Sequence, residues 1–393
     1  ENQIGEQQNQ SSIFAELLAQ AIKHIGLSES TATSDFKLRC LFYTIVPGRA
    51  VICIYDVKSE IEYDKAFEII LESIMEISEN LASLETVDIL ELKVNNRLRE
   101  SFGYVPDDLY ERQFALFTKL VSDPNITMFF EPIIYINPTA PGIHGWEALA
   151  RDKRTDKAPV LLFDTAELWG TRFILELDMH CLRKAIQIYE REPDNPNQYR
   201  RKNTMKMLTI NVHPNSLLRT AYYRVLKEIQ NQGKMPLNLI YLEISEKAPI
   251  PITDDWDGET NVIDTFRVFV KNRFRAYDVH LAVDDYGVGF ASPSRISRLG
   301  PKIVKIDRDA LLDDFGNFTL ESVINLTSNL PGEIDTIVEG FDVQSKFPLR
   351  RLYKLGVRYI QGHKFAYAQE KINDRLPKEI VDEIRKDLSS FAE

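Results

Sequence analysis

Short apolar runs alternate with longer amphipathic stretches along the C-terminal two thirds of the chain. Each run has the length of a buried strand, and each stretch between two runs has the apolar spacing of a helix that packs on one face. Eight strands alternating with helices over roughly 260 residues match the size of a (β/α)₈ barrel. The predicted strands span Thr127–Tyr135, His144–Leu149, Met207–Val212, Asn238–Ile244, Val279–Asp284, Ile303–Ile306, Thr336–Glu339 and Val357–Gln361.

The stretches between these strands predict the outer layer of the barrel, and a further helix is predicted at the C-terminal end. The predicted helices span Asp164–Tyr189, Pro214–Asn231, Thr260–Tyr277, Arg308–Asn329, Val343–Leu355 and Asp374–Phe391. The polar segment Glu190–Lys206 contains Pro and Asn residues, which predicts a surface loop.

The first 110 residues have a different pattern, which predicts a small separate α/β domain with a regulatory or assembly role. A helix at Pro106–Leu120 leads from it into the barrel domain, which we place at residues 111–393. The elements predicted in the first domain are helices at Ile13–Ile25 and Asp64–Ser83 and strands at Lys37–Val46, Val51–Val57 and Thr86–Val94.

Composition narrows the class of protein. The formal net charge of −11 opposes binding to a nucleic-acid polymer, which needs a basic face. No apolar stretch approaches the roughly 18 residues of a membrane-spanning helix. The three cysteines are widely spaced and form no disulfide framework, so we expect a reducing, cytoplasmic environment.

Polar residues occur where the predicted barrel strands end. Active sites of such barrels lie at the carboxyl ends of the strands, so these side chains are expected to meet at one mouth. The residues are Glu147, Asn211, Glu243 and the following Glu246, Asp284 with Asp285, Lys305, Glu339 and Gln361. Taken singly, each carboxylate could instead cap the next helix.

Clustered carboxylates repel one another unless cations accompany them. Carboxylate and amide oxygens suit Mg²⁺ or Mn²⁺ better than Zn²⁺. The pair Asp284-Asp285 could bridge two ions, an arrangement used for attack of water on phosphodiesters. Lys305 could orient the water or stabilise charge on the phosphate.

Seven short motifs in this part of the chain resemble, in order and spacing, those of the EAL-domain cyclic di-GMP phosphodiesterases. They cover roughly three fifths of the chain. The motifs are Glu147–Arg151, Asn211–Val212, Glu243–Glu246, Asp284–Phe290, Lys305–Asp307, Glu339–Gly340 and Gln361–Gly362.

The resemblance implies a barrel whose first strand is antiparallel to the others, a homodimer, and bacterial second-messenger signalling by hydrolysis of cyclic di-GMP to linear pGpG with two Mg²⁺ or Mn²⁺ ions. By motif, Lys305 would hold the catalytic water, Glu339 would serve the second ion, and Glu246 would anchor the loop after Asp285. The implied metal ligands are Glu147, Asn211, Glu243, Asp284 and Asp285. The implied substrate contacts are Glu131, Leu149, Arg151 and Gln361.

Several positions depart from the family pattern. Glu131 stands where Gln is usual, Val288 where Thr is usual, Ala291-Ser292-Pro293 where Ser-Ser-Leu is usual, and Asp342 where Glu is usual. Two other functions therefore stay open beside the enzyme. One is a non-catalytic cyclic di-GMP receptor, and the other is a protein-interaction scaffold that does not use the nucleotide.

Overall fold

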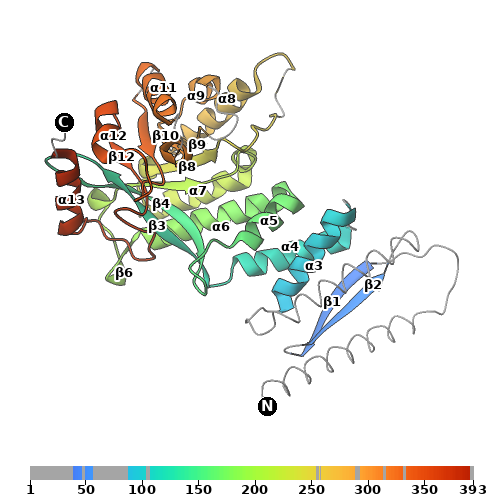
Figure 1. Cartoon of the computed structure of the whole chain (residues 1–393). Coiled ribbons are helices and arrows are strands. Elements are labelled where there is room, and N and C mark those ends of the chain that lie inside the picture. The colour runs from blue at the N-terminus through green and yellow to red at the C-terminus, as the bar shows by residue number, and fades with distance from the viewer. Residues whose placement is uncertain are drawn as a thin grey trace, which may run out of the picture. The chain divides into compact units, whose positions relative to one another are not determined.

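The structure is a computed structural model of the chain (Figure 1). It describes residues 39–46, 49–55, 87–102, 107–253, 256, 258–287, 293–312, 316–330 and 333–389. The predicted helices at Ile13–Ile25 and Asp64–Ser83 lie outside these residues, as does Val288.

The chain divides into two compact units, residues 1–123 with 160–173 and residues 124–159 with 174–393. The predicted domain boundary at residue 110 stays a prediction. The first unit contains the antiparallel hairpin of β1 (Arg39–Val46) and β2 (Arg49–Tyr55), followed by α3 (Val87–Phe102), α4 (Asp107–Val121) and α5 (Val160–Trp169).

The strand predicted at Thr86–Val94 is wrong, because this segment begins the helix α3. Leu92, Asn95 and Asn96 are buried at the three- and four-residue spacing of one helix face. The Asn95 amide donates to Gln113 of α4 at 2.8 Å. The Asn96 amide donates to Thr165 of α5 at 2.7 Å. These tertiary partners accept hydrogen bonds from the nitrogens of the two buried amides, which the local pattern of apolar residues could not reveal.

All eight predicted barrel strands are present and close into one barrel, in the order β10-β11-β12-β3-β4-β7-β8-β9. The first strand, β3, pairs antiparallel with both of its neighbours, and the other pairs are parallel, as expected. The strands are β3 (Ile126–Tyr135), β4 (Gly142–Asp152), β7 (Met207–Asn211), β8 (Ile240–Ser245), β9 (His280–Tyr286), β10 (Ile303–Ile306), β11 (Asp335–Val338) and β12 (Tyr359–Ile360).

The helices follow the predicted order but differ in extent. Gly170, at φ 92°, separates two helices where one was predicted over Asp164–Tyr189. The segment Glu190–Lys206, predicted as a loop, carries a small hairpin of β5 (Arg191–Glu192) and β6 (Asn195–Tyr199). The helices of this region are α6 (Thr171–Tyr189), α7 (Thr220–Gln232), α8 (Val262–Phe274), α9 (Pro293–Leu299), α10 (Asp309–Leu312), α11 (Gly316–Asn329), α12 (Leu349–Leu355) and α13 (Lys378–Ser389), which lies beside α12 in Figure 1.

Four of these helices, α9 to α12, correct the prediction further. The single helix expected at Arg308–Asn329 is two, α10 and α11, and the helix expected at Val343–Leu355 begins only at Leu349. Helix α9 follows β9 and was not predicted, because its seven residues are too short for a helical pattern to stand out.

The barrel interior is built in layers because side chains of a strand alternate between its two faces. One layer is apolar and consists of Ile133, Met207, Ala282, Ile303 and Ile337. Two residues further toward the carboxyl ends of the parallel strands come Thr209, Asp284, Lys305 and Glu339. The alternate positions, such as Val304 and Ile306, pack outward into a core that includes Leu320 and Leu352 of the helices. The same period that fills the barrel therefore places the polar residues inside its mouth.

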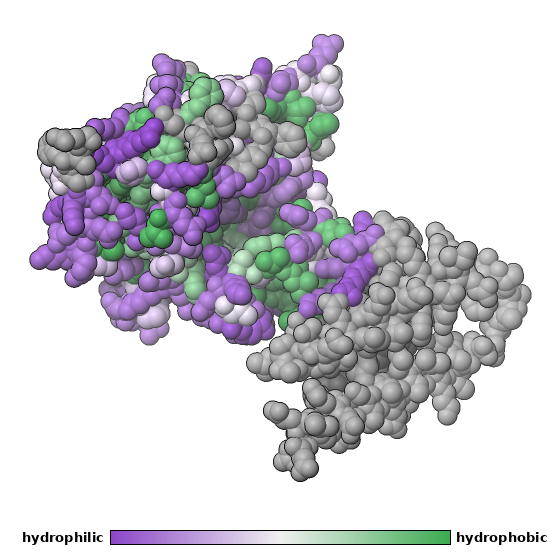
Figure 2. Space-filling view, viewed as in Figure 1, coloured by the Kyte–Doolittle hydropathy of each residue, from purple (hydrophilic) through white to green (hydrophobic). Residues whose placement is uncertain are grey.

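The face of the molecule in Figure 2 is mostly hydrophilic where it is described, with apolar side chains in scattered patches. No helix among the described residues is long and apolar enough to cross a membrane.

Candidate metal and substrate site

Lys305 lies at the centre of a cluster of carboxylates inside the barrel mouth. Its side chain is fully buried, and its Nζ lies 2.8 Å from Glu147 Oε2 and 2.6 Å from Glu339 Oε1. Glu243 Oε1 lies 3.2 Å from the same Nζ, and Asp284 Oδ1 lies 3.6 Å from it. Four predicted site carboxylates from four different strands or strand ends therefore converge on one ammonium group.

Glu147 is further held by two amides. Asn211 Nδ2 donates to its Oε1 at 3.0 Å, and Gln361 Nε2 donates to its Oε2 at 2.6 Å. Closure of the barrel brings Gln361 to this carboxylate across 214 residues of sequence. Glu147 does not end its strand as predicted, because β4 continues to Asp152, but its side chain still points into the cluster.

The electrostatics of the cluster follow from burial and from Lys305. Burial opposes ionisation of Glu147, but the charge of Lys305 and the three hydrogen-bond donors hold its pKa below the ordinary value. Burial raises the pKa of Glu243 well above the ordinary value, with Lys305 offsetting only part of the rise. Burial does the same to the pKa of Glu339. Burial opposes the ammonium charge of Lys305 too, yet its carboxylate neighbours raise its pKa well above the ordinary value.

The donor set of this cluster fits a hard divalent cation. Glu147, Glu243 and Asp284 each offer an oxygen, and these oxygens lie within 4.8 Å of one another. The amide oxygen of Asn211, whose residue pairs with Glu243 across β7 and β8, can complete an all-oxygen set. Because the carboxylates outnumber the single ammonium group, added positive charge would relieve their repulsion.

Asp285 and Glu246 lie outside this cluster. Asp285 has φ 58°, and the pairing of β9 with β10 is irregular beside it, between Val304 and Ile306. Such a bulge re-aims a side chain. Asp285 instead accepts a hydrogen bond from Ser245 Oγ at 2.8 Å. Glu246 is buried directly after β8. The loop that it was predicted to anchor includes residues 288–292, which lie outside the described part of the chain, so this role stays a prediction.

A cavity of about 260 Å³ opens beside the cluster. Glu131, Leu149 and Gln361, all predicted substrate contacts, line it together with Glu147 and Glu339. The fourth predicted contact, Arg151, is not among its lining residues, and its guanidinium donates to the Ala150 carbonyl at 2.9 Å. The lining residues absent from the predicted set are Asp307, Arg308, Gly340, Asp342, Gly362 and His363.

The sequence pattern could have identified two of these lining residues, Asp307 and His363. Asp307 follows Lys305 by two residues, and His363 follows Gln361 by two, so the period of the strands continues past their ends. Gly362 has a steric role, because it has φ 144° and an added Cβ would lie 2.3 Å from the Phe341 nitrogen. That approach keeps the chain after Gln361 against the end of β11, where Glu339 is held.

Glu131 faces Glu147 across β3 and β4, where the two residues are register partners. Burial and the neighbouring charge of Glu147 raise the pKa of Glu131 to about 7, although Lys305 opposes this shift. Glu131, a carboxyl group with a raised pKa, therefore lines the cavity at the position where the resemblance implies a neutral Gln.

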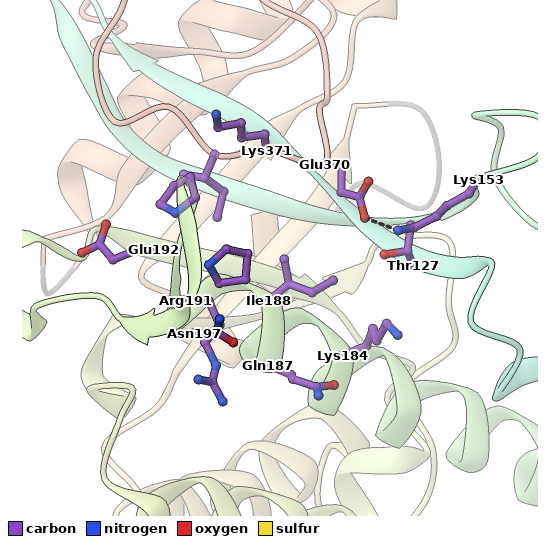
Figure 3. A pocket seen from close by; sticks show the side chains of 13 residues that line it. Thr127, Lys153, Lys184, Gln187, Ile188, Arg191, Glu192, Asn197, Glu370 and Lys371 are labelled. Atoms are coloured by element: carbon purple, nitrogen blue, oxygen red, sulfur yellow. Dashed lines mark ion pairs between the residues drawn. The ribbon is translucent and has the colours of Figure 1, made fainter.

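A larger cavity, of about 600 Å³, lies elsewhere in the barrel unit (Figure 3). It is bordered by β3, the end of α6, the β5–β6 hairpin and residues 370–372. Lys153 and Glu370 on its wall form an ion pair, which Figure 3 marks. None of the predicted site residues lines it. Its side chains lack a converging set of carboxylates, so the smaller cavity is the candidate site.

Asp178 of α6 holds the loop that follows Asn211. Its Oδ2 accepts a hydrogen bond from the His213 backbone nitrogen at 3.0 Å. Burial raises the pKa of Asp178 to about 7, although this hydrogen bond opposes the shift. The unfolded chain releases the Asp proton near pH ~4. The contribution of Asp178 to the free energy of unfolding therefore falls as pH rises from ~4 to about 7 and then stays level.

Asp178→Asn is expected to stabilise the protein, and to do so by about 2 kcal/mol more at pH 8 than at pH 5, because Asn still accepts the hydrogen bond without the buried charge. Urea unfolding at the two pH values measures the difference. Asp194→Asn, at an exposed carboxylate paired with Lys371, is the matched control and should show no such pH dependence. An equal effect of Asp178→Asn at both pH values would contradict the assignment.

Comparison with known proteins adds family information to this geometry. Residues 115–368 match the family described as EAL domain. The probable cyclic di-GMP phosphodiesterase PdeI of Escherichia coli K12 is 25% identical over 246 residues, which cover 61% of this chain and 28% of that protein. This chain thus spans less than a third of that relative's length.

Solved structures share the fold. The YkuI protein of Bacillus subtilis, solved with substrate c-di-GMP and calcium, has a TM-score of 0.51 and 20% identity, covering 69% of this chain and 63% of its own. A standalone EAL protein of Vibrio cholerae O395, solved in a c-di-GMP-bound form, has a TM-score of 0.50 and 21% identity, covering 66% of this chain and 98% of its own. At these identities the likeness shows the fold alone.

Proposed function

This chain belongs to the EAL domain family, and on that premise we propose that it is a cyclic di-GMP phosphodiesterase that forms linear pGpG with Mg²⁺ or Mn²⁺. The observation that carries the proposal is the convergence of Glu147, Glu243 and Asp284 on one point beside a cavity. The relative named as a probable cyclic di-GMP phosphodiesterase supports the choice of substrate. A homodimer, as in the family expectation, is part of the same proposal.

In this mechanism Glu147, Glu243, Asp284 and Asn211 would hold one divalent ion, and Asp284, Asp285 and Glu339 would serve a second. When bound, such ions lower the pKa of a water and neutralise charge on phosphate. Lys305, with its ammonium group held by Glu147 and Glu339, would orient that water and stabilise the charge that develops on the phosphate. Gln361 and Leu149 would position the nucleotide in the cavity.

The test is turnover by the purified protein. Cyclic di-GMP is incubated with the chain and Mn²⁺ or Mg²⁺, and the product is separated by chromatography. Formation of linear pGpG that stops when the ions are chelated is the expected result. Tight binding without product would instead select the receptor, and absence of both binding and turnover would leave the scaffold.

The receptor is the second candidate function because Asp285 is turned away from the cluster. A site with one carboxylate fewer could bind the nucleotide and lack the second ion. Retention of the other carboxylates around Lys305 favours the enzyme.

Glu131→Gln is expected to raise affinity for cyclic di-GMP by about three- to tenfold. The substitution removes a carboxylate that would repel a phosphate at the cavity wall and keeps a side chain of the same size. Calorimetric titration of the nucleotide into the protein with Ca²⁺ present, so that any turnover is slow, measures the affinity. Glu192→Gln, on the wall of the larger cavity, is the control. Unchanged or weaker binding would show that Glu131 lies away from the phosphates or helps to bind the ligand.

A further inference from the structure

Lys247 is a second cation at the barrel mouth, distinct from Lys305. It follows Glu246 after the end of β8, and its Nζ lies 3.1 Å from Asp285 Oδ1. The other oxygen of Asp285 accepts the Ser245 hydroxyl at 2.8 Å. Both oxygens of this carboxylate are therefore engaged by residues of one short segment.

Carboxylates surround Lys247 and favour a positive charge at this place. Burial opposes its charge, but the carboxylate of Asp285, with smaller effects of Asp307 and Asp284, raises its pKa above the ordinary value. Asp307 lines the same cavity as the cluster around Lys305. Asp285 is the one predicted metal carboxylate that does not contact Lys305, and it is the one that contacts Lys247. The predicted ligands thus separate into two groups, each with its own ammonium group.

We propose that Lys247 competes with the second divalent ion for the carboxylate of Asp285. This ion would bind only after the Lys247 ammonium group has left Asp285. This inference rests on the two-ion site of the proposed function. The ion pair is open to displacement, since 54% of the Lys247 side chain is exposed and exposed pairs are weak. The first ion, bound by Glu147, Glu243 and Asp284, would enter without moving Lys247. The chain would then respond to the concentration of divalent ions through its second site.

Binding of Mn²⁺ to the full chain, without nucleotide, tests the proposal by calorimetry and by electron paramagnetic resonance of free Mn²⁺. Lys247→Met removes the charge and keeps the length of the side chain, whereas Lys247→Arg keeps the charge. The weaker of two binding steps should tighten about tenfold in Lys247→Met, because removal of a positive charge near a divalent ion lifts a repulsion that water and salt screen only partly. The tighter step should not change.

Lys247→Arg and the matched control Lys371→Met, at an exposed lysine paired with Asp194, should both bind Mn²⁺ like the original protein. An unchanged weaker step in Lys247→Met, or equal tightening in Lys247→Arg, would overturn the proposal even if cyclic di-GMP is hydrolysed. Absence of any Mn²⁺ binding would overturn both this proposal and the proposed function. Absence of turnover with the expected shift in Mn²⁺ binding would overturn the proposed function alone.

Discussion

Glu147→Ala is expected to reduce the rate of cyclic di-GMP hydrolysis by about 10³-fold or more, equivalent to a loss of about 4 kcal/mol of transition-state stabilisation. The substitution removes a proposed metal ligand and also the acceptor that three donors share, namely Lys305, Asn211 and Gln361. These donors would no longer be fixed relative to the phosphate. Steady-state turnover with saturating Mn²⁺, measured by product chromatography, gives the magnitude.

The matched control for this variant is Glu370→Ala, because Glu370 is a half-exposed carboxylate paired with Lys153 on the larger cavity. Its turnover should stay within about twofold of the original protein, as expected for a surface substitution far from the chemistry. Circular dichroism of both variants separates loss of chemistry from loss of fold. Activity of a folded Glu147→Ala protein within tenfold of the original would contradict the proposed metal site.

Lys305→Met is expected to lower the free energy of unfolding by about 3–5 kcal/mol when divalent ions are absent, because it leaves buried carboxylates without their shared counter-ion. Mn²⁺ should recover much of this loss, since an ion that binds only the folded state stabilises it. Urea unfolding with Mn²⁺ and with a chelator measures both effects.

The pH dependence of the same variant has a definite sign. Burial already raises the pKa of Glu243 and Glu339 in the presence of Lys305, and loss of its charge raises both pKa values further. The folded state then binds protons more tightly than the unfolded state, so the deficit shrinks as pH falls toward the unfolded Glu value of ~4.3. Lys364→Met, which breaks a partly exposed pair with Asp387, is the control and should lack this dependence. An equal deficit with and without Mn²⁺ would count against a cation site.

The fold follows from local periodicity to a large extent. The fully buried run Ile303–Ile306 was predicted to its ends, because a strand covered on both faces is apolar at every position except one with a special role. That exception, Lys305, marks the site from sequence alone. Thr86–Val94 shows the limit of the method, because nine residues fit either a strand or two and a half turns of helix until the buried partners of Asn95 and Asn96 are known.

The sequence by itself determined that carboxylates and an amide follow the barrel strands, since the strand period fixes which side chains face inward. Only the tertiary structure decided which of them meet. Barrel closure, a long-range event, brings Gln361 to Glu147, and burial beside Lys305 shifts the pKa values of Glu147, Glu243 and Glu339. An irregularity in the pairing of β9 and β10 separates Asp285 from Asp284, although the two are adjacent in sequence. Register and bulges depend on neighbouring strands, so no local pattern could assign Asp285 to Lys247.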